Sequence, residues 1–316
     1  MKFLEKLIKK TNIFQRTVGL SLKQFNILLN RLENSWTAAE KQRKSNDNRK
    51  RKIGAGHPYK FQSLEHKFLI VLLYYKLYLT QEFLGIIIDL DQANVSRLLK
   101  NMLPLIEQTA DPELATYLKN VKDLQSSDER INNLAELLEK YPDLKDVSID
   151  AEEQPCYRSK KNETQKNYYS GKKKRHTVKT QLSVSKTARI LDVSDMYGGS
   201  VHDKTIIDQE ETVQKFPTKI CLRFDSGYQG VKQKNPEHYI VLPTKKPKGK
   251  ELSKLAKEHN RVNSQRRVIV EHVISRLKKF RICGNVYRGP MESHNQTIRN
   301  VASILNFKLA NSTIAV

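Results

Sequence analysis

The sequence contains few cysteines and no long hydrophobic run. Its cysteines, Cys156, Cys221 and Cys283, are odd in number, widely spaced and free of any Cys-x-x-Cys or Cys/His pattern. A disulfide framework and a cysteine-based structural zinc site are therefore excluded, and a reducing compartment is expected. Charged residues interrupt the apolar residues at the start of the chain, so no secretory signal peptide is indicated, and no run reaches membrane-spanning length. These absences predict a cytoplasmic protein.

Acidic residues are also scarce relative to basic ones. Asp and Glu total 34 against 57 Lys and Arg, which leaves a net charge of 57 − 34 = +23. The positive charge recurs along the whole chain, so it favours nucleic acid as the partner over a membrane surface. With 316 residues, 38% of them hydrophobic, the chain can build one large or two ordinary domains, which excludes wholesale disorder.

The N-terminal region combines an amphipathic helix with a basic segment. Apolar residues keep helical spacing from Ser21 to about Lys44, and Ser21 is placed to cap that helix. From Lys41 to Lys60, basic residues lie among Asn, Ser, Gly and Pro, a composition that builds no core. We interpret this segment as an exposed linker, which could be a solvated spacer or an arm that binds phosphates.

Three helices separated by tight turns follow. A strongly apolar helix is predicted over Leu64–Leu79, Thr80 is placed to cap a short helix that ends at Ile88, and Asp91 precedes a third helix, Gln92–Glu107. Such helices also occur in proteins that never bind DNA, but the net charge favours a helix-turn-helix. The last helix would then enter the major groove with its N-terminal residues facing the bases. Those residues are Gln92, Asn94, Ser96 and Arg97.

The second half of the chain predicts a mixed α/β domain. It follows a polar helical connector from about Asp111 to Lys140. The order of three strands, a helix, two strands and a long helix favours a sheet with an antiparallel portion and later crossovers. The predicted strands are Lys145–Asp150, His176–Ser185, Ala188–Met196, Thr218–Asp225 and Tyr239–Leu242, and the predicted helices are His202–Gln214 and Val262–Phe280.

Two acidic residues are expected where strands end. Asp150 follows Val147-Ser148-Ile149, and Asp225 follows an apolar run and precedes Ser226-Gly227. Alone, either residue would be interpreted as a turn residue that binds its own backbone. As a pair they favour a ligand site, because ligands of α/β sheets bind outside the carboxyl ends of the strands and adjacent carboxylates repel unless a cation lies between them.

A third acidic residue, Glu271, lies on the long C-terminal helix. Helical spacing puts Val270, Val273, Ile274 and Leu277 on a core-facing stripe, with Arg267, Glu271 and Lys278 together beside it. The simpler interpretation is an Arg267–Glu271 ion pair on the helix surface. With Asp150 and Asp225, however, Glu271 completes an all-oxygen ligand set suited to Mg²⁺ or Mn²⁺. A pair of such ions supports in-line displacement at phosphorus, which is the chemistry of cutting and joining DNA.

A dense basic segment follows the first of these acids. Glu163 alone opposes its positive charge, and three tyrosines interleave with it. We interpret it as a hairpin that contacts phosphates, with a solvated charge run as the alternative. The basic residues are Arg158, Lys160, Lys161, Lys166, Lys172, Lys173, Lys174 and Arg175.

These motifs together resemble those of the DDE transposases of bacterial insertion sequences, in the branch related to eukaryotic Harbinger-type elements. The resemblance covers most of the chain. Around Glu271 the family pattern is Tyr, two residues, Arg, three residues, Glu, six residues and Lys. Arg267, Glu271 and Lys278 fit this pattern, whereas Ser264 stands at the Tyr position. The other matching blocks are Ser148–Pro155, Tyr168–His176, Gly199–Lys204 and Asp225–Gly230.

The resemblance implies an RNase H-like catalytic domain preceded by a helix-turn-helix, acting as a multimer on terminal inverted repeats. It implies that Asp150, Asp225 and Glu271 are catalytic and hold a divalent metal, and that Arg267 and Lys278 contact DNA near the cleavage site. Turns are expected at Gly171, Gly227 and Gly230. His202 and Asp203 are expected to cap the helix that buries Ile206 and Ile207.

The expected organisation is an N-terminal region with a basic linker (1–60), a helix-turn-helix (61–110), a helical connector (111–144) and the catalytic domain (145–316). The expected function is metal-dependent transposition by a homo-oligomer on double-stranded DNA, at the nucleoid of a bacterium. An endonuclease without strand transfer and a non-catalytic regulator descended from a transposase stay open as alternatives. An RNA-binding protein is disfavoured, because the sequence contains no RNP or KH motif.

Overall fold

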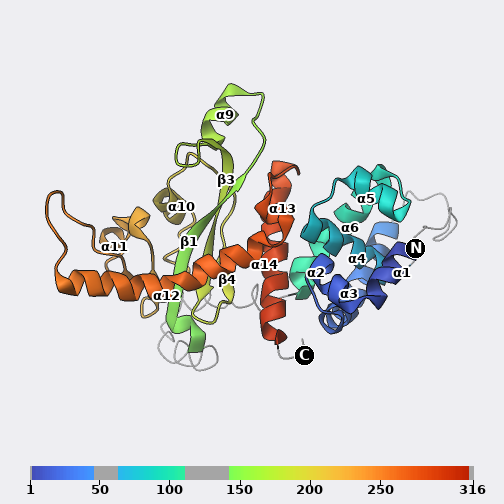
Figure 1. Ribbon diagram of the computed structural model, residues 1–316, viewed down its shortest axis with the longest axis horizontal. Coiled ribbons are helices and arrows are strands. Elements are labelled where there is room, and N and C mark those ends of the chain that lie inside the picture. Colours follow the sequence, from blue (N-terminus) through green and yellow to red (C-terminus); the bar gives the residue numbers. More distant parts are fainter. Residues whose placement is uncertain (1, 46–62, 111–141, 313–316) are drawn as a thin grey trace. The chain divides into compact units, whose positions relative to one another are not determined.

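The computed structural model describes residues 2–45, 63–110 and 142–312 (Figure 1). The predicted connector, from Asp111 to Lys140, and most of the predicted basic linker lie outside the described residues. No described helix is long and apolar enough to cross a membrane. The chain forms two compact units, a helical one and an α/β one.

The helical unit contains residues 1–112 together with two C-terminal segments, 278–285 and 296–316. Its C-terminal part is tied in by specific contacts, since the amide of Asn300 donates to the Tyr75 hydroxyl at 2.9 Å. The helices are α1 (Lys2–Lys9), α2 (Thr11–Val18), α3 (Leu22–Lys44), α4 (Leu64–Leu77), α5 (Gln81–Ile88), α6 (Gln92–Ala110), α13 (Arg281–Gly284) and most of α14 (His294–Ala310).

Local capping chemistry explains where these helices begin. The Ser21 hydroxyl accepts from the Gln24 backbone N–H, and the Gln24 side chain accepts from the Ser21 N–H, which is a complete capping box before α3. The Thr80 hydroxyl accepts from the backbone N–H of Phe83 at the start of α5. The predicted succession of three helices, α4, α5 and α6, is therefore confirmed, with α6 beginning at Gln92 as expected.

The α/β unit contains residues 113–277 and 286–295. Its sheet has the order β2-β3-β1-β6-β7, and β4 and β5 also pair with β3. The elements are β1 (Asp146–Pro155), α9 (Asn162–Tyr168), β2 (Tyr169–Ser170), β3 (Arg175–Ser185), β4 (Ile190–Val193), β5 (Tyr197–Gly198), α10 (Asp203–Gln209), β6 (Cys221–Arg223), α11 (Val231–Lys234), β7 (Ile240–Val241) and α12 (Lys254–Lys278), with short 3₁₀ turns η1 (Pro142–Lys145), η2 (Ser226–Tyr228) and η3 (Met291–Ser293).

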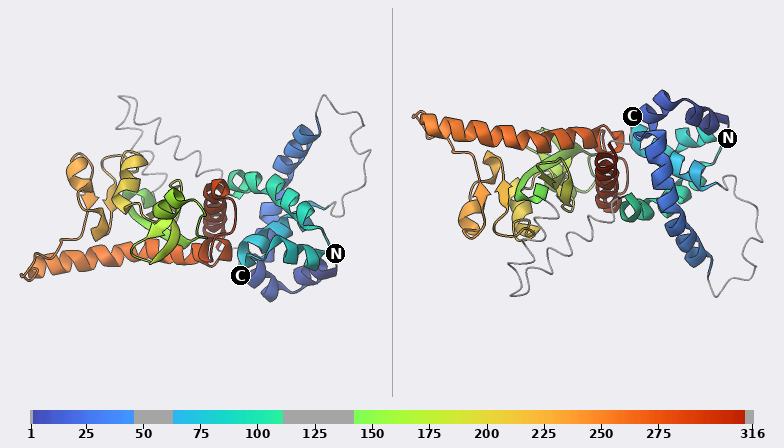
Figure 2. Two further views of the ribbon diagram at one scale, coloured as in Figure 1. Left: turned by 90° about the horizontal axis from the view of Figure 1, so that it is seen from above. Right: turned by 90° about the horizontal axis from the view of Figure 1, so that it is seen from below.

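The sheet has the mixed pairing that the sequence predicts. β1, β3 and β4 are antiparallel neighbours, whereas β6 pairs parallel with both β1 and β7. The long helix α12 covers one face, and α10 and α11 lie on the other (Figure 2). This arrangement confirms an RNase H-like α/β domain that follows a helical region.

One boundary differs from the prediction in a way that matters for the site. We expected the first strand to end at Asp150, but β1 continues to Pro155, paired with β3 throughout. The extension carries Glu152 and Gln154, which are 2% and 0% exposed. Buried polar residues interrupt the apolar pattern by which a strand is predicted, so no pattern in the sequence marks this extension of β1. Asp150 therefore lies in the middle of β1.

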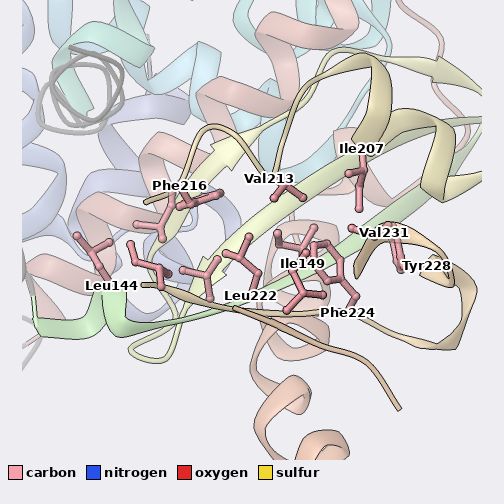
Figure 3. Packing of buried hydrophobic residues seen from close by; sticks show 13 residues of the cluster. Leu144, Ile149, Ile207, Val213, Phe216, Leu222, Phe224, Tyr228 and Val231 are labelled. Atoms are coloured by element: carbon pink, nitrogen blue, oxygen red, sulfur yellow. The ribbon is translucent and has the colours of Figure 1, made fainter. Parts of the chain in front are cut away.

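A hydrophobic cluster on the α10 side of the sheet fixes the strands beneath the site (Figure 3). Val147 and Ile149 of β1 and Leu222 of β6 point into it together with Phe224 and Tyr228, and all five are fully buried. Because successive strand residues face opposite sides, Asp146, Ser148 and Asp150 must point to the other face, toward α12.

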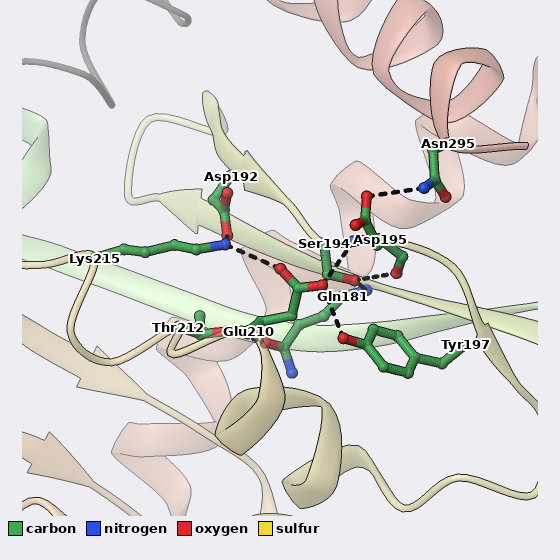
Figure 4. Close-up of polar contacts among 9 residues, drawn as sticks. All are labelled: Gln181, Asp192, Ser194, Asp195, Tyr197, Glu210, Thr212, Lys215 and Asn295. Carbon is green, nitrogen blue, oxygen red and sulfur yellow. Dashed lines mark hydrogen bonds and ion pairs between the residues drawn. The ribbon is translucent and has the colours of Figure 1, made fainter. Parts of the chain in front are cut away.

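A polar network fastens the end of α10 to β4 and β5 (Figure 4). The carboxylate of Glu210 accepts from the hydroxyl of Tyr197 at 2.9 Å, from the backbone N–H of Asp195 at 3.0 Å and from Lys215 at 3.3 Å. Lys215 also pairs with Asp192 at 2.9 Å. These charge-assisted bonds hold the pKa of Glu210 below its usual range despite its burial. The network thus fixes α10, whose first residue is Asp203.

Candidate active site

Asp150 and Asp225 occupy equivalent positions on neighbouring parallel strands. The β1–β6 ladder pairs Asp146 with Cys221 and Ser148 with Arg223. Continuing that register by two residues places Asp150 opposite Asp225, just beyond the carboxyl end of β6. Adjacent strands are about 4.8 Å apart, so the two carboxylates share one edge of the sheet. The structure therefore brings together two of the three predicted acids.

A tight turn sets the direction of the Asp225 side chain. Its Oδ1 accepts from the backbone N–H of Gly227 at 2.7 Å. A Cβ atom at Gly227 would stand 3.0 Å from the same oxygen, which is too close for an ordinary contact. Gly230 follows with φ +91°, in the region that favours glycine. Turns at Gly227 and Gly230 are as predicted, and they carry the chain away from Asp225.

A buried arginine fixes α12 against β1. Arg223 donates from Nε and Nη2 to both oxygens of Asp146, at 2.7 and 2.8 Å, and from Nη1 to Asn263 of α12 at 3.3 Å. Arg266 adds a bond to Asp146 at 3.3 Å. Arg223 is only 6% exposed, so this bidentate pair is largely shielded from water. These contacts were not predicted from the sequence, although Arg223 and Asp146 both lie in predicted strands.

One helical turn beyond Asn263, Arg267 reaches the candidate site. Its Nη2 donates to Oδ2 of Asp150 at 3.3 Å. The simpler sequence interpretation paired Arg267 with Glu271, but Arg267 pairs with Asp150 instead. Glu271 lies one turn further along α12 and is exposed. Three residues of the predicted core-facing stripe, Val270, Val273 and Leu277, are buried, and the fourth, Ile274, is half-buried.

The surroundings of Asp150 oppose its ionisation. Burial raises the pKa of Asp150 to about 6, and the negative charges of Asp225 and Asp203 act in the same direction. The guanidinium of Arg267 and the backbone N–H of Ala151, which donates to Oδ1 at 2.9 Å, act against that rise. The site thus concentrates negative charge and gains from any cation that approaches it.

Asp203 is a nearby acid to which the sequence analysis gave a different role. It was expected, with His202, to cap α10. His202 does precede the helix, and Ile206 and Ile207 are buried, but the His202 side chain makes no capping bond. Asp203 instead accepts from Lys179 of β3 at 2.9 Å. The shared G-x-x-H-D block gave the signal for this residue, but pairing with Lys179 depends on the sheet and was not readable from spacing.

The donor types at this edge suit a hard divalent cation. Asp150, Asp225 and Glu271 offer carboxylate oxygens, which Mg²⁺ and Mn²⁺ prefer, and the pKa of Asp150 is raised chiefly by burial, with the charges of Asp225 and Asp203 adding to the rise. Within residues 2–45, 63–110 and 142–312, however, no three His, Cys, Asp or Glu residues lie close enough together to form a metal group. The structure gathers Asp150 and Asp225, and leaves Glu271 on the adjacent helix.

Apart from Arg267, which is only partly exposed, the residues predicted to contact DNA are exposed in both units. Gln92, Asn94, Ser96 and Arg97 lie on the first two turns of α6, where Arg97 donates to the Asn94 side chain at 2.7 Å. In the α/β unit, the predicted basic residues Lys172, Lys173, Lys174 and Arg175 form the exposed turn between β2 and β3. Lys278 is the exposed last residue of α12.

Comparison with known proteins gives matches in both halves of the chain. A family model described as DDE superfamily endonuclease matches residues 149–306, and one described as helix-turn-helix of DDE superfamily endonuclease matches residues 59–112. The chain is 30% identical over 302 residues to the probable transposase for insertion sequence element IS702 of Microchaete diplosiphon, an alignment that covers 94% of each chain. No solved structure matches the chain. The Harbinger-related branch is not distinguished by these matches.

Proposed function

We propose that this chain, which belongs to the DDE superfamily of endonucleases, is a transposase. It cuts the ends of a mobile DNA element and joins them to target DNA, in a reaction that depends on a divalent metal. The observation that supports this most directly is the shared register of Asp150 and Asp225 at the carboxyl end of a parallel strand pair. Ligands of α/β sheets bind outside the carboxyl ends of the strands, and carboxylates held there can bind the divalent ions that promote phosphoryl transfer.

Asp150, Asp225 and Glu271 are the residues that we expect to hold the metal ions. When bound, a pair of divalent ions activates the attacking water or 3′-hydroxyl and stabilises the leaving oxygen at the scissile phosphate. The turn at Gly227 orients Asp225, and the Arg223–Asp146–Asn263 contacts fix α12, which carries Glu271. The complete ligand set requires the Glu271 side chain to move toward the two aspartates, because no three such ligands lie together in the described residues.

Positive residues of the chain would hold the substrate. Arg267 lies next to Asp150, and 12% of its side chain is exposed. As DNA and metal enter, its guanidinium can leave the Asp150 carboxylate and bind a phosphate. The exposed turn at Lys172–Arg175 would contact the backbone, and the start of α6 would read bases at the element ends. The proposal includes a homo-oligomer assembled on the terminal repeats, acting at the bacterial nucleoid.

The decisive experiment is an assay of cleavage and strand transfer on labelled DNA that carries the element's own ends, with Mg²⁺ or Mn²⁺. Asp150→Asn, Asp225→Asn and Glu271→Gln should each abolish nicking and joining while DNA binding persists. Glu258→Gln is the matched control, because Glu258 lies on the same helix but pairs with Arg261 in solvent. This variant should cut and join like the wild type.

Each other outcome identifies an alternative. Metal-dependent nicking by the wild type without any joined product would favour an endonuclease that lacks strand transfer. Sequence-specific binding without cleavage, unchanged by all three substitutions, would favour a regulator descended from a transposase. Cleavage that survives Glu271→Gln but not the aspartate substitutions would remove Glu271 from the metal-binding set.

A further inference from the structure

The loop between β7 and α12 presents an unusual group of lysines. Residues 244–250, which we call the lysine turn, contain Lys245, Lys246, Lys248 and Lys250, and every residue in the turn is exposed. The predictions from sequence did not include this segment. In Figure 1 it lies at the end of α12 that extends beyond the strands.

The lysine turn has a defined backbone. The N–H of Lys250 donates to the carbonyl of Pro247 at 3.3 Å, which closes a four-residue turn. Gly249, the third residue, has φ +75°, as a type II turn requires at that position. No atom lies within 4 Å of where its Cβ would be, so the glycine is needed for the backbone conformation and not for space.

The N-terminal end of the turn, at Pro243 and Thr244, is tied to elements of the candidate site. The Asn260 side chain of α12 accepts from the backbone N–H of Thr244 at 2.7 Å and donates to its carbonyl at 3.0 Å. Gln229, which follows the Asp225 turn, donates to the carbonyl of Pro243 at 3.4 Å. The lysine turn is therefore held at a fixed place relative to α12 and to Asp225.

Acidic neighbours neutralise only part of this charge. Glu251 pairs with Lys257 at 2.6 Å and more distantly with Lys246 at 3.9 Å. In the part of the chain that the structure describes, no ion pair is formed by Lys245, Lys248 or Lys250. Three like charges held on one rigid turn repel each other, and a polyanion relieves that repulsion.

For a DNA duplex that passes the active site parallel to α12, the spacing along the helix gives the distance from the lysine turn to the scissile phosphate. Asn260 precedes Arg267 and Glu271 on one continuous helix. At a rise of 1.5 Å per residue these are about 10 and about 16 Å away along the axis. With 3.4 Å per base pair, the lysine turn stands about three to five base pairs from the scissile phosphate.

We infer that the lysine turn is a phosphate clamp for the DNA duplex flanking the cleavage site, and that Asn260 is the residue that positions it. The inference rests on the proposed function for its substrate, double-stranded DNA, and adds a contact surface outside the acids and outside the Lys172–Arg175 turn. The clamp reads no bases, because lysines on a turn contact the backbone of any sequence.

The test compares how duplex binding depends on salt. Full-length wild type, the variant Lys245→Gln/Lys248→Gln/Lys250→Gln and a control variant are titrated with a random-sequence duplex over a range of salt concentrations. Each phosphate contact contributes about 0.9 to the slope of log K against log salt, so the triple variant should lose up to about 2.7 from that slope. The control removes the same charge from other exposed positions of the α/β unit. It carries Lys186→Gln, Lys219→Gln and Lys232→Gln, and its slope should stay at the wild-type value.

An unchanged slope in the triple variant, or an equal loss in the control, would overturn the clamp. Ethylation interference locates it: modified phosphates about three to five base pairs from the scissile position should weaken binding by the wild type. The same modified phosphates should not weaken DNA binding by the Asn260→Ala variant, which keeps all the lysines but loses the side-chain bonds to Thr244. Interference that Asn260→Ala leaves intact would contradict the positioning role.

Cleavage and strand transfer assays separate this inference from the proposed function. If the triple variant fails at end cleavage, the clamped duplex is the element's flank, and if it fails only at joining pre-cut ends, the clamped duplex is the target. If the salt slopes of the wild type and the triple variant differ as expected but the wild type never cuts DNA, the clamp is supported and the transposase proposal is rejected. A wild type that cuts and joins while the slopes agree would reject the clamp alone.

Discussion

Arg267 donates a hydrogen bond to Asp150 across the gap between α12 and β1, at 3.3 Å, and does not pair with Glu271 on its own helix. The side chains of Arg267 and Asp150 are 12% and 22% exposed, so the pair is partly shielded from solvent. The bond links the helix of the third acid directly to the first acid, in addition to the bond that Arg266 of α12 donates to Asp146 of β1.

Removing Arg267 should destabilise the metal-free protein. Arg267→Ala leaves the Asp150 carboxylate near Asp225 without a cation, at a cost of about 1–3 kcal/mol in the free energy of unfolding. In an Asp150→Asn background the cost should shrink by about 1 kcal/mol, because the charge that needs Arg267 is gone. Urea denaturation in the presence of a chelator measures the free energy of unfolding of the wild type, the two single variants and the double variant. Additive effects of the two substitutions would contradict the coupling.

Glu271 should behave in the opposite way. It is exposed on the same helix, so Glu271→Ala should change the free energy of unfolding by no more than about 0.5 kcal/mol. If the proposed function holds, the same variant loses DNA cleavage entirely. Parallel urea denaturation and cleavage assays check this separation. A large loss of stability would indicate that Glu271 has a structural partner in solution.

Much of the helical unit was predictable because short-range chemistry determines it. Ser21 and Thr80 each accept the backbone bond expected of a cap, and both signals are local in sequence. The docking of the C-terminal segments in that unit was not predictable, since the bond from Asn300 to Tyr75 joins residues far apart in the chain. Polar residues that pair across such distances leave no periodic pattern.

The candidate site was predictable to the extent that strand ends and helix faces determine it. The positions of Asp150 and Asp225 follow from apolar runs, and their alignment follows from a parallel register. The extension of β1 was hidden because Glu152 is polar yet buried. Likewise α12 begins at Lys254, whereas the prediction placed its start at Val262. The first turns were missed because they are exposed on nearly all sides and show no apolar stripe.

Stability should fall with acid through His294. This residue is fully buried, its Nε2 lies 3.1 Å from Oε1 of Gln154, and its ring packs edge-on against Tyr287. Burial lowers the pKa of His294 from 6.5 to about 4 in the folded protein. Since the folded pKa lies below the unfolded one, the stability is complete above pH 6.5 and declines as pH falls toward 4. The full loss is about 3 kcal/mol, from 2.5 pKa units at 1.36 kcal/mol each.

The variant His294→Gln isolates this contribution, because its amide can still donate to Gln154 but does not titrate. The free energy of unfolding of the wild type, minus that of the variant, should fall by about 2 kcal/mol as the pH is lowered from about 7.5 to about 5. Other groups that titrate in this range cancel in the difference. A difference that stays constant with pH would show that His294 is protonated equally in both states.

The cluster beneath the site should be intolerant of cavities. Leu222 of β6 is fully buried there, between the strand of Asp150 and the turn of Asp225. Leu222→Ala should cost about 2–5 kcal/mol, measured by urea denaturation. Leu255→Ala is the matched control, because Leu255 is 85% exposed and its truncation should cost less than about 0.5 kcal/mol. Similar costs for both variants would mean that the cluster relaxes around the missing side chain.

The two exposed basic surfaces should differ in what they read. Arg97 bonds to Asn94 at the start of α6 and is proposed to contact bases, so Arg97→Ala should lower the preference for the element's ends over random duplex by about 1–3 kcal/mol. Lys173 lies on the exposed turn between β2 and β3, so Lys173→Ala should weaken both DNAs equally and reduce the salt slope by about 1. Competition binding against both duplexes at several salt concentrations measures each effect. If Arg97→Ala weakened both duplexes equally, α6 would contact the backbone alone, and sequence recognition would have to reside elsewhere in the chain.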